Sequence, residues 1–187
     1  MTRSLRPILL LAALLLAACG GTGGDPAPTA APASADPHPC DLLTTDQVAS
    51  VLGMPIVEVE RSEAEVVNGG QASCTWMGED AGTALGLIVE GPGFFSAALP
   101  GYTGSAEAFE FWRDDALEAG FPVIDVEAVG DAAFMPVLGD GAPNSLVMQH
   151  GDYLAHVSLV PGGEASMSEV ARWVAAELDR RAGAAGS

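Results

Sequence analysis

Two glycine-aspartate turns constrain the fold of this chain more than any other feature. Gly130-Asp131 and Gly151-Asp152 each lie between two segments rich in apolar residues. Short turns of this kind join neighbouring strands, which then pair antiparallel. The flanking segments, which we predict to be strands, are 123–129, 132–137, 145–150 and 153–160.

The other segments of the domain have patterns that predict three more strands and three helices. Thr44 and Gln47 have the spacing of a capping box, which starts a helix that Gly53 and Pro55 end. Alternating apolar and polar residues then predict strands at 56–61, 72–77 and 84–90. Two further helices are predicted, one at 105–119 with Ser105 as its cap and one from Ser166 onwards.

This order of elements predicts an α+β fold. Hairpins grouped between helices favour an antiparallel sheet of about six to seven strands with the helices packed on one face. The order of helix, three strands, helix, four strands and helix also admits a duplicated helix-plus-meander unit. No repeat of side chains supports such a duplication.

The N-terminal segment has the pattern of a secretory signal. Arg3 and Arg6 precede an apolar run from Ile8 to Ala18, which is shorter than the roughly 20 residues needed to cross a membrane. Leu16-Ala17-Ala18-Cys19 resembles the lipobox of bacterial lipoproteins. The resemblance implies cleavage after residue 18 and attachment of lipid, such as palmitate, to Cys19. The alternative is an ordinary secretory leader with Cys19 near the cut by chance.

Composition separates a spacer from a folded domain. Residues 19–39 are rich in Gly, Pro and Ala and cannot bury a core, so we expect a disordered spacer behind the lipid site. Residues 40–182 predict one extracytoplasmic domain, and 183–187 a disordered tail. The formal net charge of -18 repels phosphate backbones and excludes nucleic acid as a partner.

Three cysteines remain to be assigned. If Cys19 carries lipid, Cys40 and Cys74 form an even set outside the cytoplasm, where disulfides persist. A bridge between them would staple the domain. Metal binding by two free thiols is the competing interpretation, but it lacks further ligands at zinc-type spacing.

Several short motifs occur in a characteristic order. They are Cys40 to Val48, Leu52-Gly53, Cys74-Thr75-Trp76, and Val129 to Phe134. With the lipobox before them, they resemble a family of actinobacterial envelope lipoproteins of unknown function. The resemblance implies a disulfide-stapled α+β domain, lipid-anchored on the outer face of the cell membrane. It brings no catalytic residues.

Catalytic and metal-binding patterns are weak. His150 and His156 are the best metal candidates, with Asp152, Gln149 or Asn144 nearby, but zinc normally takes at least three protein ligands. No serine lies in a Gly-x-Ser-x-Gly elbow, which argues against a hydrolase. We therefore expect a non-enzymatic protein without a cofactor.

Binding remains as the expected activity. Phe94, Phe95 and Tyr102 fall in a segment broken by Pro and Gly, predicted as an irregular loop that could contact a ligand or partner. The alternative is that these rings fold back and complete the core. Two hypotheses follow. One is an anchored module or carrier for an envelope protein or hydrophobic small molecule, and the other is an accessory or sensor-like domain.

Overall fold

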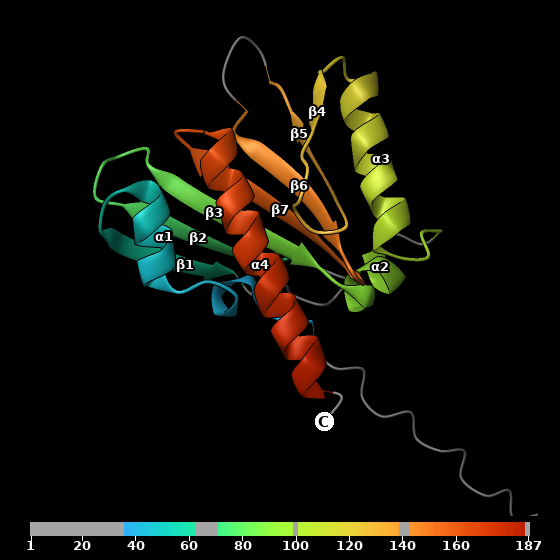
Figure 1. Cartoon of the computed structure of the whole chain (residues 1–187), viewed down its shortest axis with the longest axis horizontal. Helices are drawn as coiled ribbons and strands as arrows, with labels where there is room; N and C mark the ends of the chain where they lie inside the picture. Colours follow the sequence, from blue (N-terminus) through green and yellow to red (C-terminus); the bar gives the residue numbers. More distant parts are fainter. Residues whose placement is uncertain (1–35, 63–70, 99–100, 139–142, 186–187) are drawn as a thin grey trace, which may run out of the picture. The chain divides into compact units, whose positions relative to one another are not determined.

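The computed structural model describes residues 36–62, 71–98, 101–138 and 143–185. Within these ranges, seven strands form one antiparallel sheet in the order β1-β2-β3-β7-β6-β5-β4 (Figure 1). The strands are β1 (Ile56–Ser62), β2 (Ala72–Gly78), β3 (Ala84–Glu90), β4 (Val123–Asp125), β5 (Ala132–Pro136), β6 (Ser145–His150) and β7 (Tyr153–Val160). The helices are η1 (Pro39–Asp41), a 3-10 turn, and α1 (Thr45–Leu52), α2 (Pro92–Ala98), α3 (Ser105–Glu118) and α4 (Glu164–Ala185). The predicted α+β class is confirmed.

The sheet consists of two meanders side by side. Strands β1, β2 and β3 form the first and β4 to β7 the second. They join through the antiparallel pair β3 and β7, in which Gly86 lies opposite Ser158 and Ile88 opposite His156. Consecutive strands within each meander are neighbours, as hairpins with short turns require.

Local signals explain where the first helix begins and ends. The backbone N–H of Thr44 donates to Gln47 Oε1 at 2.8 Å, and the backbone N–H of Gln47 donates to Thr44 Oγ1 at 3.2 Å. These two bonds form the predicted capping box. Gly53 ends α1 with φ of 70°, a left-handed conformation that favours glycine.

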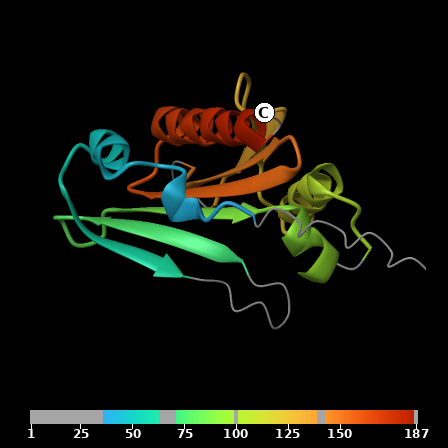
Figure 2. The ribbon, with the colours of Figure 1, turned by 90° about the horizontal axis from the view of Figure 1, so that it is seen from below.

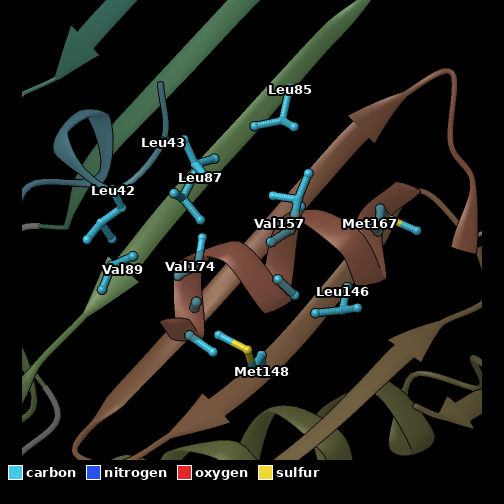
Figure 3. Close-up of a cluster of buried hydrophobic side chains, with 14 of the residues drawn as sticks. Leu42, Leu43, Leu85, Leu87, Val89, Leu146, Met148, Val157, Met167 and Val174 are labelled. Atoms are coloured by element: carbon cyan, nitrogen blue, oxygen red, sulfur yellow. The ribbon is translucent and has the colours of Figure 1, made fainter. Parts of the chain in front are cut away.

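One face of the sheet is covered by α1 and α4 (Figure 2). Their apolar side chains meet those of the strands in a continuous core, in which Leu87, Val157 and Met148 face Val174 and Met167 (Figure 3). Alternate strand residues point to opposite faces. The core therefore accounts for only half of the side chains of each strand.

The opposite face carries α2 and α3. Phe109 of α3 contacts Phe134 of β5, with ring centroids 5.2 Å apart, and Val147 and Leu154 join the same cluster. Val147 and Leu154 alternate with residues of the first core, so α3 packs on the other side of β6 and β7 from α4. The prediction of helices on one face is therefore wrong.

This arrangement also disfavours the duplicated unit. The helix before the first meander, α1, lies on one face, while the helix before the second, α3, lies on the other. Two antiparallel neighbours such as β3 and β7 are related by a rotation about the sheet normal, which keeps a helix on its own face. The two units are consequently not copies related by that rotation.

Three segments differ from expectation in detail. The loop expected around Phe94 and Phe95 contains helix α2, whose first backbone N–H groups, at Gly93 and Phe94, donate to the Asp36 side chain. The strand expected at 123–129 ends at Asp125. Helix α4 continues to Ala185, into the expected tail, whereas the leader and most of the spacer lie outside the described residues.

Candidate functional site

The predicted aromatic contact residues do not form an exposed patch. Phe95 is 2% exposed and belongs to the core under α3. Phe94 packs against the same cluster, and Tyr102 lies against Phe111 with ring centroids 5.3 Å apart. The alternative interpretation, in which these rings complete the core, agrees with this arrangement.

The two histidines lie on opposite faces of the sheet. His150 Nε2 is 2.9 Å from Asp179 Oδ1 of α4, on the face that α4 covers. His156 lies on the other face, with its ring centroid 5.4 Å from that of Trp112 in α3. They cannot share a metal ion. In the described part of the chain, no group of three or more His, Cys, Asp or Glu side chains could hold one.

The predicted disulfide is confirmed. Cys40 and Cys74 form a disulfide, with their Cα atoms 5.1 Å apart, that ties η1 to β2. Cys74 is fully buried in the cluster beneath α1 and α4, so the bridge lies on the face that these two helices cover. Cys19 lies outside the described residues. Those residues contain no helix long and apolar enough to cross a membrane.

The half of the sheet beside α3 contains a recess of about 460 Å³. Helix α3 packs over β5, β6 and β7, and β2 and β3 extend beyond it. The floor of the recess comes from the strands and includes Thr75, Gly86, Ile88, Ser145, His156 and Ser158. Its wall comes from α3 and the segments flanking β4 and β5, and includes Trp112, Asp115, Ala116, Phe121, Pro136 and Leu138.

Small side chains keep the floor open. Thr75, Gly86, Ser158 and Ser145 lie opposite one another across four neighbouring strands. A Cβ atom at Gly86 would lie 2.5 Å from Ser158 Oγ, so any other residue there would displace that hydroxyl. Gly86 therefore sets the depth of the recess.

The wall is mainly apolar and reaches solvent. Phe121 is 37% exposed and Leu138 is 44% exposed, which is unusual for large apolar side chains that line one hollow. Exposed apolar surface in a concave site favours a ligand with apolar surface of its own.

Three buried polar atoms lie on or directly behind the lining of the recess near His156. They are Glu90 Oε2, His156 Nε2 and Trp112 Nε1, and none has a hydrogen-bond partner among the described residues. His156 Nε2 is 3.6 Å from Glu90 Oε2, beyond ordinary hydrogen-bond distance. The other oxygen of the fully buried Glu90 accepts from the Gln71 amide. Native proteins leave few buried polar atoms unpaired, which makes this end of the recess the best candidate for ligand contact.

Sequence reasoning named His156 as a metal candidate and missed the other residues of the recess. Two signals were present. Gly86 interrupts an apolar strand, which indicates a close approach or open space, and Glu90 ends the same strand with a charge. The contribution of α3 depends on the face that the helix covers, which no local pattern specifies.

Comparison with known protein families identifies a match. Residues 14–134 match a family described as a protein of unknown function (DUF3558). No curated protein matches the chain in sequence.

Proposed function

The chain belongs to this family of unknown function, and we propose that it is a lipid-anchored binding module of the cell envelope that holds a small, mainly apolar molecule in the recess. The proposal assigns it no catalysis. The single observation that carries the binding role is the recess itself, whose volume of about 460 Å³ falls within the range typical of small-molecule sites.

The polar groups of the recess favour binding over hydrolysis. A serine nucleophile needs its hydroxyl hydrogen-bonded to an adjacent base. Ser158 Oγ instead donates to the backbone oxygen of Gly86 at 3.5 Å, and Nε2 of His156 is turned toward Glu90. The Ser158 hydroxyl and the His156 imidazole, two positions apart on β7, are thus directed to other partners and not to each other.

The anchor rests on the lipobox-like segment Leu16 to Cys19 and on the apolar run before it. The disulfide supports an extracytoplasmic location, because such bonds persist in oxidising compartments. The Pro-rich segment 20–39 would then hold the domain away from the bilayer.

Native mass spectrometry tests the binding role. The chain should be extracted from its own cells and should retain a small molecule as added mass. The double variant Gly86→Val/Ser158→Ala fills the floor without the clash at Ser158 Oγ, and it should lose that mass. Ser158→Ala alone is the matched control and should keep it. A bare mass for the unsubstituted chain, or equal retention by all three, would contradict binding in the recess.

Acylation is tested separately. We expect the chain to fractionate with membranes and its Cys19 peptide to carry acyl groups, and Cys19→Ser to abolish both. Recovery of the unsubstituted protein from the cytosol, or an unmodified Cys19 peptide, would refute the lipid anchor. Neither result would bear on ligand binding in the recess.

A further inference from the structure

We infer that the ligand of the recess is uncharged and carries a hydrogen-bond acceptor, a carbonyl or hydroxyl oxygen, that binds the indole N–H of Trp112. This inference rests on the proposed binding function and specifies its ligand class. It follows from the unpaired donor of a side chain that lines the recess and from the charges around it.

Trp112 supplies the donor. Its Nε1 is buried and has no hydrogen-bond partner among the described residues, although the side chain lines the recess. An indole nitrogen can only donate, so only an acceptor can satisfy it. The ring is held edge to face against His156, at 84° between the two planes. The donor is therefore positioned before any ligand arrives.

Charges at the recess disfavour an anionic ligand. The fully buried Glu90 lies 3.6 Å behind His156 Nε2, and Asp115 stands on the wall. No arginine lines the recess in the described ranges, and the chain contains no lysine. The formal net charge of -18 adds to the repulsion. Among the described lining residues, a carboxylate or phosphate would find the imidazole of His156, already beside a carboxylate, as its only basic side chain.

A cationic ligand is disfavoured at the same end for a different reason. An ammonium group is a donor, as the indole N–H is, so the two cannot pair. The two nearby carboxylates do not replace the missing partner. Glu90 is fully buried behind His156 and does not line the recess, and Asp115 is exposed, so solvent weakens its attraction for a cation. The apolar wall and the open floor at Gly86 are instead suited to an uncharged ring or chain.

Four probes with one naphthalene core separate these cases: naphthalene, 2-acetonaphthone, 2-naphthoate and 2-naphthylmethylammonium. They are titrated into the ¹⁵N-labelled full chain carrying Cys19→Ser, with binding followed by amide and indole N–H resonances. We expect 2-acetonaphthone to bind roughly threefold to tenfold more tightly than naphthalene, as one added hydrogen bond allows. It should also move the Trp112 indole resonance downfield. The two charged probes should bind more weakly than 2-acetonaphthone.

Trp112→Phe removes the N–H and keeps a ring in place. In this variant 2-acetonaphthone should bind no more tightly than naphthalene. Trp173→Phe, on the helix that covers the opposite face, is the matched control and should leave the difference intact. The indole shift in the unsubstituted Trp112 chain decides the question even if Trp112→Phe does not fold.

The outcomes distinguish the two levels of the proposal. Equal binding of naphthalene and 2-acetonaphthone, a motionless Trp112 resonance, or tighter binding of a charged probe would overturn the inferred ligand class and leave an apolar site. No binding by any probe would overturn the recess as a binding site and the inference with it.

Discussion

Opening the disulfide should destabilise the domain strongly. Cys40 and Cys74 are 34 positions apart, so the bridge closes a loop of 35 residues that contains α1 and β1. The chain-entropy relation gives a loss of about 4 kcal/mol in the free energy of unfolding for a loop of this length. For a domain of about 150 residues this corresponds to a fall in Tm of roughly 8 to 16 °C.

Packing around the bridge explains why reduction is the cleaner perturbation. Cys74 is fully buried in the core beneath α1 and α4, and Cys40 packs against the same cluster. Reduction opens the loop and keeps both sulfur atoms, so it isolates the entropic contribution. The double variant Cys40→Ala/Cys74→Ala also loses the buried sulfur contacts. Its free energy of unfolding should therefore equal that of the reduced protein or lie slightly below it.

Urea unfolding of the full chain measures the effect. Oxidised protein, protein kept in dithiothreitol and the double alanine variant are unfolded side by side, with tryptophan fluorescence and far-ultraviolet circular dichroism as probes. Thiol titration verifies the redox state. A difference below about 1 kcal/mol between oxidised and reduced protein would refute the loop-closure reasoning. Such a result would mean that the unfolded chain between Cys40 and Cys74 keeps residual order, or is equally restricted, when the bridge is absent.

Three further changes test local features, each by urea unfolding. Thr44→Ala removes the capping box and should cost about 1 kcal/mol. Gly130→Ala should cost more than about 1 kcal/mol, because φ is 57° and a Cβ would lie 2.5 Å from the backbone oxygen of Gln149. Hydrogen bonds from Arg180 and Arg181 lower the pKa of Glu177 from 4.5 to about 2. Its stabilising contribution is therefore full above pH 4.5 and lost as the pH falls toward 2, and Glu177→Gln should flatten the stability profile in that window.

Each of these changes has a control on the same chain. Thr45→Ala alters the neighbouring exposed residue without touching the cap and should be nearly neutral. Gly183→Ala, where a Cβ meets nothing, should not destabilise, since the helix favours alanine. For Glu177, an unchanged pH profile in the glutamine variant would show that the ion pairs with the two arginines contribute nothing to folding.

Local rules predicted the strands and helices well because their signals lie within a few residues. The Thr44 cap, the Gly53 stop and the turn at Gly151 each act on neighbouring backbone groups, so the sequence alone locates them. The same reasoning missed α2, whose first backbone N–H groups are bound by Asp36, more than fifty positions earlier. A cap supplied from a distant segment leaves no pattern in the helix itself.

Ser105 illustrates the same limit within α3. Its hydroxyl was expected to cap the helix, but the N-cap residue is Gly104 and makes no side-chain cap. Ser105 Oγ instead donates to the backbone oxygen of Gly151 at 2.7 Å and ties the start of α3 to the turn between β6 and β7. This tertiary bond helps to hold α3, the helix that carries Trp112, on its face of the sheet.

Periodicity assigns strand residues to two faces but does not say which helix covers which face. The recess depends on that choice, because α3 covers β5 to β7 and leaves the small residues of β2 and β3 beside it uncovered. The bridge, α1 and α4 meanwhile complete the other face, where Leu87 and Val157 are almost fully buried. The larger of the two buried clusters thus lies on one side of the sheet. The opposite side can therefore keep an open floor of glycine and hydroxyl residues, whose exposure to water costs little, beside an apolar wall that a ligand would cover.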